Sequence, residues 1–425
     1  MEIIGLMRKI PLWLSILGGM FFGVVYVVLA IHFGWNEFTY KFVRPFGIIF
    51  VKMLKLMAIP LIFFSLINGI ASLKNISGLS SIGLKTIAFY IFTTFVAIII
   101  GLVLANVIKP GKYANVDISN ITVDKNFTKN LTKDNYPLGF LEDIVPDNIV
   151  EASSDNKKML QVIFFAIFFG IALVKIGSKN SNIVLDFVKQ VNNIILKMID
   201  FIMLYAPFGV FALIADVFVS FSLNSSVTEV FKAVLVYSFT VILGLLAMIL
   251  ILYPLLLKIF TNKNPYKIIK QLLPVQLLAF STSSSAATLP FTMEICEKKL
   301  NVSKEISSFV LPIGATVNMD GTSLYQSVAA LFIAQIYGID LSLSLQLTIV
   351  ITALLASIGA AAVPGAGIVM LVIVLNSVGL PNEGIALILA VDRLLDMMRT
   401  VVNVTSDATV SFIIDSIQRK ASLAQ

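Results

Sequence analysis

Long apolar runs separated by short polar stretches dominate the chain. A helix crosses the hydrocarbon core of a bilayer with about 17–25 residues, so each run of that length is a candidate span. In the first part of the chain, the pattern predicts spanning helices at 10–32, 46–70, 86–108, 159–176, 194–219 and 230–257. Within the fifth of them, the sequence YAPFG at 205–209 contains proline and glycine and predicts a turn.

Two further apolar runs are each broken in the middle by small and polar residues. Residues 271–295 are broken at STSSSAATLP (281–290), and lysine-rich segments flank this run on both sides. Residues 342–376 are broken at ASIGAAAVPGAG (356–367), and the adjoining segments contain no Lys or Arg. Because loops rich in Lys and Arg stay in the cytoplasm, we expect the first run to enter and leave from inside and the second from outside. The pattern therefore predicts two re-entrant helical hairpins that enter from opposite faces.

Each predicted hairpin is followed by a spanning helix with polar residues in its middle. The helix at 306–337 is interrupted by NMDGT (318–322). The helix at 385–415 carries polar side chains that share an arc of about 100° on a helical wheel. This arc contains Asp392, Asp396, Arg399, Thr400, Asn403 and Asp407. An ionisable side chain at the bilayer centre costs about 2.5–3.5 kcal/mol, so the arc must face protein or water.

The order hairpin–span, hairpin–span predicts an inverted repeat, and paired broken segments of this kind mark the midplane site of a transporter. The fold class that follows is an all-α polytopic membrane protein with eight transmembrane helices and two re-entrant hairpins. Arg8 and Lys9 precede the first span and Arg419 and Lys420 follow the last, which places both termini in the cytoplasm.

Composition supports the membrane interpretation. The 425 residues are 58% hydrophobic and 13% charged, whereas a soluble globular protein carries about 25% charged residues. The net charge of +7 is explained by lysines in the predicted cytoplasmic loops rather than by nucleic-acid binding. One Cys and one His exclude a disulfide framework and a His/Cys metal cluster.

The polar arc and the broken helix contain the residues expected to carry chemistry. Arg399 can hold a carboxylate with two hydrogen bonds, and Asp396 can neutralise a primary ammonium group, which together suit an acidic amino acid. The alternative is a purely structural ion pair between these two residues. Asn318, Asp320, Asn403 and Asp407 offer oxygen ligands for Na⁺ or H⁺ coupling. Tyr90, Thr93 and Thr94 also offer oxygens, although helix–helix hydrogen bonding explains them slightly better on the sequence alone.

The charges of this site predict a need for cations. Four carboxylates (Asp320, Asp392, Asp396, Asp407) stand against two guanidinium groups (Arg393, Arg399), which leaves a net charge of −2. An acidic amino acid adds one more negative charge. If all these groups face the site, about three monovalent cations are needed to neutralise the loaded site, because uncompensated charge is costly inside a membrane.

Four ordered motifs identify a resemblance. SSSAATLP, LPIGATVNMDGTSLYQ, ASIGAAAVPGAG and DMMRTVVNVTSD are similar to motifs of the dicarboxylate/amino acid:cation symporters, which comprise bacterial and archaeal glutamate/aspartate transporters and the excitatory amino-acid transporters. The resemblance covers nearly the whole chain. It implies an elevator-type homotrimer in the cell (inner or plasma) membrane, with co-transported Na⁺ and no organic cofactor. It also implies scaffold helices 1–2 in 1–80, transport-domain helix 3 in 81–110, an extracellular loop with scaffold helices 4–5 in 111–222, and the rest of the transport domain in 223–425.

The resemblance also implies roles for individual residues. The substrate-binding residues are expected to be Ser285, Thr322, Val363, Gly367, Asp396, Arg399, Thr400 and Asn403. A first sodium site is expected from Gly314, Asn318, Asn403 and Asp407, a second from Thr316, Ser357, Ile358 and Ala360, and a third from Tyr90, Thr93, Thr94, Asn318 and Asp320. With this resemblance the Tyr90–Thr94 group is interpreted as functional. The chain departs from the family at Ser283 and Met397, where some archaeal or animal members carry arginine.

We therefore expect a sodium-coupled symporter of L-aspartate or L-glutamate that works by alternating access. The alternative within transport is a proton-coupled glutamate symporter or a C4-dicarboxylate symporter. An ion channel is disfavoured because the intramembrane charges lie on an internal repeat and not on a symmetry axis. An intramembrane hydrolase using Ser283–Ser285 is disfavoured because His32, the single histidine, lies near the end of the first span.

Overall fold

The described part of the computed structural model is built from helices. It comprises residues 12–72, 80–114, 145–154, 158–176, 178–222, 227–261, 263–358, 360 and 365–423, and no strand occurs among them. Four helical stretches in this part are long and apolar enough to cross a membrane by length and composition. These stretches are 36–68, 82–113, 183–216 and 229–260. The all-α membrane architecture predicted from the pattern agrees with this result.

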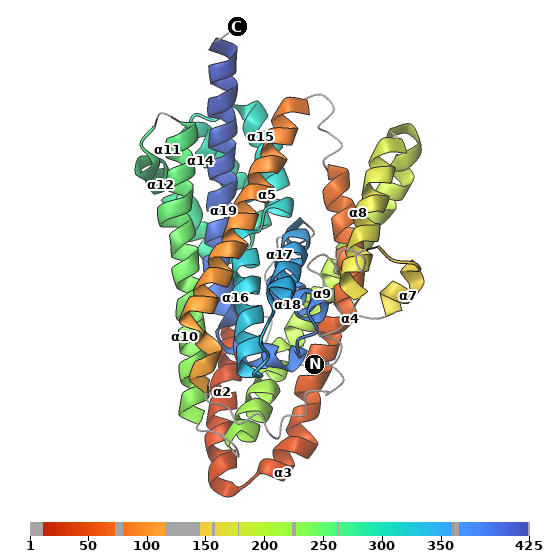
Figure 1. The fold of residues 1–425 in the computed structure, drawn as a ribbon, viewed down its shortest axis with the longest axis vertical. Helices are drawn as coiled ribbons and strands as arrows, with labels where there is room; N and C mark the ends of the chain where they lie inside the picture. Colours follow the sequence, from red (N-terminus) through yellow and green to blue (C-terminus); the bar gives the residue numbers. More distant parts are fainter. Residues whose placement is uncertain are drawn as a thin grey trace, which may run out of the picture.

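One group of helices is formed by the early part of the chain. It contains α2 (Leu12–Phe33), α4 (Arg44–Ser72), α8 (Met159–Ile176) and α9 (Ser178–Ser222). α4 packs against both α8 and α9, and α2 packs against α9. Figure 1 shows α4 and α8 on the right-hand side of the molecule and α2 in its lower part, with the short α3 (Asn36–Phe38) at the end opposite the C-terminus.

The second group joins one early helix to the late part of the chain. It contains α5 (Ser80–Ile108), α10 (Val227–Ala247), α15 (Lys304–Val317), α16 (Asp320–Ile336) and α19 (Ile385–Leu423). α16 packs against α5, α10 and α19, and every side chain from Asp320 to Ala334 is buried. α16 is therefore the centre of this group, with α5 beside it in Figure 1.

The turn predicted at 205–209 is wrong, because α9 continues through Pro207 without a break. Proline removes one helical hydrogen bond but does not prevent a helix when packing holds the chain. Here the small residue Gly209 lies directly against the Phe50 ring, where a Cβ would come within 2.5 Å of Cγ. Tyr205 also donates a hydrogen bond from its hydroxyl to the Phe46 carbonyl at 3.2 Å. The residues that suggested a turn instead allow α9 to approach α4 closely.

Both predicted hairpins are helical on either side of a short break. In the first, α13 (Leu273–Thr282) is followed by α14 (Ser285–Lys298), so the break is much shorter than the predicted 281–290. Ser283 adopts a left-handed conformation with φ of 51° and ends α13. Ser284 caps α14 by accepting a hydrogen bond from the Ala287 amide at 3.2 Å, which satisfies one of the free amides of the first turn.

The second hairpin consists of α17 (Leu343–Ile358) and α18 (Ala366–Ser377). Gly365 precedes α18 with φ of 81°, a conformation that glycine adopts without steric cost. Residues 361–364 of the predicted tip lie outside the described residues. α18 packs against α4 and α8, whereas α13 and α14 pack against α19.

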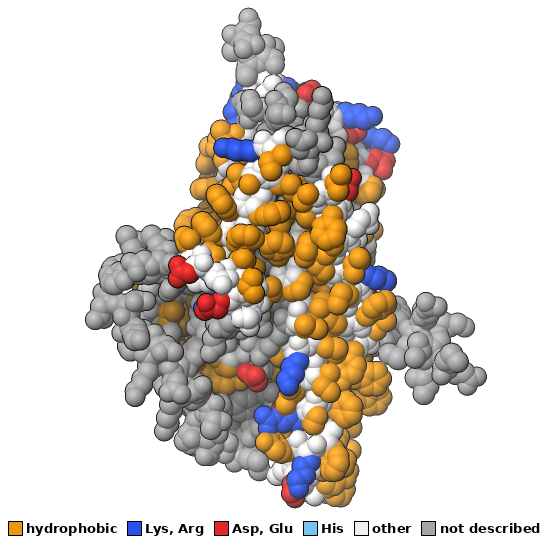
Figure 2. Space-filling model, turned by 90° about the vertical axis from the view of Figure 1, so that its right-hand side faces the viewer, with side chains coloured by type: hydrophobic (Ala, Val, Ile, Leu, Met, Phe, Trp, Pro, Cys, Tyr) orange, Lys and Arg blue, Asp and Glu red, His pale blue; other side chains and the backbone are white. Residues whose placement is uncertain are grey.

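The predicted interruption at 318–322 is present in a shorter form, since α15 ends at Val317 and α16 begins at Asp320. The remaining short elements complete the described chain. They are π-helices η1 (Thr39–Val43) and η7 (Met248–Leu252), 3-10 helices η3 (Pro110–Ala114) and η8 (Asn382–Gly384), and α7 (Ile149–Ser154), α11 (Tyr253–Phe260) and α12 (Pro265–Gln271). Figure 2 shows that hydrophobic side chains cover most of the described surface in that view, as expected for contact with lipid.

The close contact between α5 and α16 gives a prediction for Gly101→Ala. A Cβ at Gly101 would overlap Ser327 Oγ and approach the Leu324 carbonyl oxygen to 2.8 Å. We expect the variant to lose about 1–3 kcal/mol of free energy of unfolding, because the buried helices cannot separate without cost. Thermal unfolding in detergent measures this loss. Gly18→Ala is the control, since a Cβ there meets nothing within 4 Å. An unchanged unfolding midpoint for Gly101→Ala would contradict the packing described.

Candidate functional site

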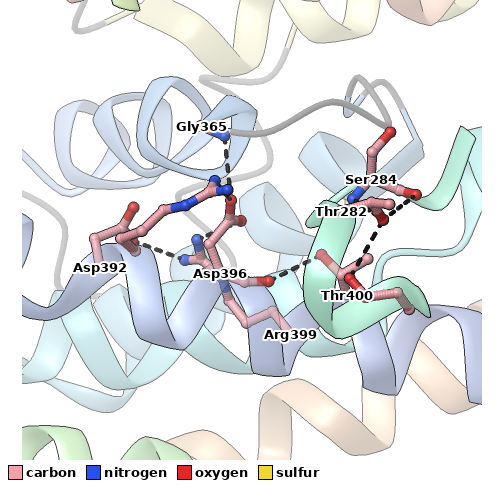
Figure 3. Close-up of polar contacts among 9 residues, drawn as sticks. Thr282, Ser284, Gly365, Asp392, Asp396, Arg399 and Thr400 are labelled. Carbon is pink, nitrogen blue, oxygen red and sulfur yellow. Dashed lines mark hydrogen bonds and ion pairs between the residues drawn. The ribbon is translucent and has the colours of Figure 1, made fainter. Parts of the chain in front are cut away.

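Four charged side chains of α19 form an arginine cluster, made of Asp392, Arg393, Asp396 and Arg399. The Arg399 guanidinium lies 2.8 Å from Asp396 Oδ1 and 3.1 Å from Asp392 Oδ1, and its side chain is only 1% exposed. Figure 3 shows these two carboxylates on the same side of α19 as the guanidinium. The guanidinium carbon also lies 3.7 Å from the centre of the Tyr325 ring. Such a stacked arginine keeps its charge while its apolar surface is covered.

Arg393 of α19 lies at the edge of this cluster that faces the first helix group. Its Nη1 lies 3.6 Å from Asp396 Oδ2, and its side chain is 17% exposed. It lines a narrow crevice together with Phe50 of α4 and Met203 of α9. The two carboxylates and two guanidinium groups of the arginine cluster therefore balance each other without an outside ion.

The hairpin tips and Thr400 surround the arginine cluster. The Gly365 amide donates to Asp396 Oδ2 at 3.3 Å, and a Cβ at Gly367 would lie 3.2 Å from Arg399 Nη2. The Thr400 hydroxyl donates to the Asp396 carbonyl at 2.9 Å. In Figure 3, Thr282 and Ser284 of the first hairpin lie near Thr400, and α13 and α14 pack against α19. Ser285 is the buried first residue of α14, whereas Val363 lies outside the described residues.

Asn403 connects α19 to the start of α16. Its Oδ1 accepts a hydrogen bond from the Gly321 amide at 2.8 Å, which satisfies one of the free amides at the helix N-terminus. Its Nδ2 donates to Thr322 Oγ1 at 3.4 Å. Thr322 and Asn403, both predicted to bind substrate, thus lie together, one turn of α19 away from Arg399.

Beyond Asn403, buried oxygens from three elements form an oxygen cluster, made of Thr93, Thr94, Asn318, Asp320, Ser406 and Asp407. The Thr94 hydroxyl donates to Asp320 Oδ1 at 2.7 Å, and the Thr93 hydroxyl lies 3.2 Å from the same atom. Both hydroxyls lie 3.3 Å from Asn318 Oδ1. The Ser406 hydroxyl donates to Asp320 Oδ2 at 2.7 Å. Of the set predicted as a third cation site, Thr93 and Thr94 of α5 are therefore brought together with Asn318 and Asp320 of the broken helix, and Ser406 of α19 lies beside them.

Gly314 and Tyr90 lie against the other carboxylate of the oxygen cluster. The Asn318 side-chain amide donates to Asp407 Oδ1 and to Ser406 Oγ, each at 2.9 Å. A Cβ at Gly314 would collide with Asp407 Oδ1 and come within 2.5 Å of the Tyr90 hydroxyl oxygen. That hydroxyl donates to the Val310 carbonyl at 3.0 Å. Of the set predicted as a first cation site, Gly314, Asn318 and Asp407 are together, while the Asn403 side chain points to Gly321.

The set predicted as a second cation site combines Thr316 of α15 with the backbone carbonyls of Ser357, Ile358 and Ala360, which lie at the end of α17 and just after it. The Ser357 hydroxyl bridges the helix break, since it accepts from the Met319 amide and donates to the Val317 carbonyl, each at 3.2 Å. The Ser357 carbonyl accepts a hydrogen bond from the Ala360 amide at 3.3 Å, and Ile358 lies between these two residues in the chain. The Thr316 side chain is exposed and donates within its own helix to the Ile313 carbonyl at 3.0 Å. α15 and α17 nevertheless pack against each other.

The two carboxylates of the oxygen cluster differ from those of the arginine cluster in their partners. Asp320 and Asp407 are buried and make no ion pair with Lys or Arg within the described residues. Burying a charge without a counter-ion costs several kcal/mol or more. Hydroxyl, amide and carboxylate oxygens are ligands that Na⁺ accepts in such broken helices. The arrangement therefore suits a monovalent cation, with protonation of the carboxylates as the other route to neutrality.

Three residues of the site were not singled out from the sequence. Tyr253 donates to Asp320 Oδ2 at 3.0 Å, Ser406 bonds the same atom, and Tyr325 lies under the Arg399 guanidinium. Ser406 falls about 40° from Asp392 on the helical wheel, so the polar arc could have included it. Tyr253 directly follows the π-helix η7, a feature that often marks functional sites but is not visible in the hydrophobic pattern.

Comparison with known proteins gives the context of this site. A model of the family described as Sodium:dicarboxylate symporter family matches residues 12–417. Excitatory amino acid transporter 3 of Mus musculus is 38% identical over 422 residues, which span 88% of this chain and 79% of that protein. The Proton/sodium-glutamate symport protein of Bacillus caldotenax is 37% identical over 415 residues, which span 96% of this chain and 94% of that protein. The similarity thus includes both hairpins and α19.

The oxygen cluster predicts that sodium chloride raises the thermal stability of the purified protein more than choline chloride does. Thr94→Val keeps the shape of the side chain but removes the hydroxyl beside Asp320. We expect the sodium concentration for half-maximal stabilisation to rise about tenfold, the usual scale for the loss of one supporting group at a metal site.

Thr86→Val is the matched control for this experiment. Thr86 is also buried on α5, but its hydroxyl donates only to the Ile82 carbonyl of the same helix at 2.8 Å. The control should keep the sodium response of the unmodified protein. Equal sodium responses in Thr94→Val and in the unmodified protein would exclude the oxygen cluster as a cation-binding site.

Proposed function

Because the chain belongs to the sodium:dicarboxylate symporter family, which is a family of transporters and not of enzymes, we propose that it is a sodium-coupled symporter of acidic amino acids. The substrate is L-aspartate or L-glutamate, and transport follows alternating access. The observation that carries this proposal is the position of the arginine cluster near a buried oxygen cluster that no cationic side chain among the described residues neutralises. The names of the mouse and Bacillus caldotenax relatives, which refer to excitatory amino acids and to sodium and glutamate, agree with it.

The arginine cluster supports recognition of an acidic amino acid by exchange of ion partners. In this structure Arg399 and Asp396 neutralise each other at 2.8 Å. A substrate with a side-chain carboxylate and an ammonium group can take the place of each partner, so that neither charge is left alone in the membrane. Gly367 leaves room beside the guanidinium for the carboxylate. Thr322 and Asn403 lie where the rest of the substrate would be bound.

Coupling follows from the helix break between α15 and α16, which connects the oxygen cluster to the residues proposed to bind the substrate. Asn318 and Asp320 flank the break between α15 and α16. The Gly321 amide, which follows Asp320, donates a hydrogen bond to Asn403. A cation bound between Thr94, Asn318 and Asp320 fixes this break, and the break in turn places Thr322 and Asn403 for the substrate. Gly314, Asn318, Asn403 and Asp407 supply the first cation site. Thr316 with the carbonyls of Ser357, Ile358 and Ala360 supplies the second once α17 closes. Substrate and cations are thereby bound as a unit.

The packing of the two helix groups supports an elevator mechanism. Residues 1–80 and 111–222 form the scaffold, and residues 81–110 and 223–425 form the transport domain. α18 of the second hairpin rests on α4 and α8 of the scaffold, while the first hairpin packs on α19 of its own domain. The second hairpin is the outer gate. The protein works as a homotrimer in the cell (inner or plasma) membrane, with both termini in the cytoplasm.

Coupling to protons, with glutamate or a C4-dicarboxylate as the substrate, is the second candidate. It is favoured by Asp320 and Asp407, which could be neutralised by protons, and by the name of the Bacillus caldotenax relative, which includes a proton. A C4-dicarboxylate has no ammonium group for Asp396, so the ion pair of Asp396 with Arg399 would stay intact. Substrate competition therefore separates this candidate from the amino-acid symporter.

Liposomes with purified protein should accumulate labelled aspartate only when sodium is higher outside than inside. The physical reason is that no cationic side chain among the described residues neutralises Asp320 and Asp407, so the loaded state must contain bound cations. The assay compares a sodium gradient with a proton gradient in sodium-free buffer. Equal uptake in the two conditions would overturn sodium coupling, and stronger competition by succinate than by glutamate would overturn the amino-acid substrate.

Arg399→Gln should reduce aspartate uptake at least about a hundredfold, because a charged hydrogen-bond donor to a buried carboxylate contributes about 3–5 kcal/mol when its loss leaves the partner unpaired. Arg399 makes no contact with the oxygen cluster in the described structure, so the variant should keep its sodium-dependent rise in thermal stability. Retained uptake in Arg399→Gln would exclude the guanidinium as the substrate anchor, and the sodium response shows that the variant is folded.

A further inference from the structure

A basic pocket lies at the end of the molecule that carries the C-terminus. It is formed where the segment before α12, the segment after α14 and the end of α19 meet, and its volume is about 360 Å³. Four cationic side chains line it, namely Lys263, Lys267, Lys299 and Arg419, and its floor is formed by the buried side chains of Ile268, Leu300 and Phe412. Figure 1 shows α12, α14 and the C-terminal end of α19 at this end.

The charges of the basic pocket are mostly uncompensated. Its one acidic residue, Asp415, is buried and already engaged, since its Oδ2 lies 2.6 Å from Arg419 Nε and its Oδ1 accepts from the Ser303 amide at 2.9 Å. The ammonium groups of Lys263, Lys267 and Lys299 make no hydrogen bond or ion pair with any described residue. By contrast, Lys298 just outside the basic pocket is paired with Glu294 at 2.9 Å. The pocket therefore offers about three free positive charges to an anion.

The surroundings of the basic pocket indicate where the anion comes from. Ile259, Tyr266, Leu273 and Leu277 on the adjoining helices α11, α12 and α13 are each more than half exposed, a surface suited to lipid chains. Tyr266 directly precedes Lys267, and tyrosine is typical of the membrane–water interface. A phosphate group held by lysines above such a surface is the arrangement expected for a phospholipid at the end of a membrane helix bundle.

We propose that the basic pocket binds the headgroup of an anionic phospholipid, with the acyl chains lying along α11–α13. Lys267 and Lys299 hold the phosphate. Arg419, whose Nε contacts Asp415 and whose Nη2 donates to the Asn301 carbonyl, offers its Nη1 as a third donor. This binding does not depend on the transported substrate. It adds a specific lipid contact to the transport domain, beyond the general attraction of lysine-rich loops to an anionic membrane surface.

The test measures lipid binding by native mass spectrometry of the purified full chain in detergent. Phosphatidylglycerol is titrated against the unmodified protein, the double variant Lys267→Gln/Lys299→Gln and the control Lys270→Gln/Lys298→Gln. The control removes the same number of charges from the same end of the molecule, but neither residue lines the basic pocket. Each lysine near a membrane surface contributes about a fivefold change in lipid affinity.

We expect one retained phosphatidylglycerol per chain in the unmodified protein and in the control, and an apparent Kd raised about thirtyfold in Lys267→Gln/Lys299→Gln. Phosphatidylcholine should not be retained. Equal losses in the two double variants would overturn the proposal, because the attraction would then be diffuse. Displacement of the lipid by millimolar inorganic phosphate would also overturn it, because the basic pocket would then be a site for a soluble anion.

Discussion

The structure depends on two buried carboxylates that have no cationic side chain to neutralise them within the described residues. Asp320 and Asp407 lie in the middle of the second helix group, and their partners are hydroxyl and amide groups only. A membrane interior does not tolerate this arrangement unless cations or protons complete it. The helix break at Asn318 and Met319, the glycine at 314 and the hydroxyls of α5 are the local features that make room for such ions. The arginine cluster, two turns away, is by contrast already neutral.

This separation of charge assigns different tasks to neighbouring turns of α19. In the proposed mechanism, the turn with Asp396 and Arg399 exchanges its internal ion partners for the side-chain carboxylate and the ammonium group of the substrate, and the second carboxylate of an acidic amino acid adds one negative charge. The turn with Ser406 and Asp407 requires charge from outside. Asn403 lies between them and accepts a hydrogen bond from the Gly321 amide in the first turn of α16. In the proposed mechanism, the cost of an empty oxygen cluster is transmitted to the substrate contacts through the N-terminal end of α16.

The sequence predicts those parts of the site in which chemistry and periodicity lie on one element. The arc from Asp392 to Asp407 follows from helical spacing alone, and α19 is continuous through it. Thr93 and Thr94 were ambiguous, because their partners lie more than 220 residues away and only the packing of α5 on α16 brings them together. Tyr253 was missed because the hydrophobic pattern does not reveal the π-helix η7 that directly precedes it. The turn expected at 205–209 failed because packing against Phe50 outweighed the local preference of proline and glycine. The resemblance to a family, and not the spacing, supplied the grouping into three cation sites.

The left-handed conformation of Ser283 has a consequence for the conformational equilibrium of the first hairpin. An L-residue in this conformation carries a penalty of about 1–2 kcal/mol that glycine avoids. Its side chain is buried and its hydroxyl makes no hydrogen bond in the described structure, so little offsets the penalty. Any movement that unwinds the tip returns this free energy, which raises the ratio of open to closed tips by a factor of about 5–30 over a glycine tip. Replacement of Ser283 by glycine would therefore stabilise the observed conformation of the tip without changing any residue of the arginine cluster or the oxygen cluster.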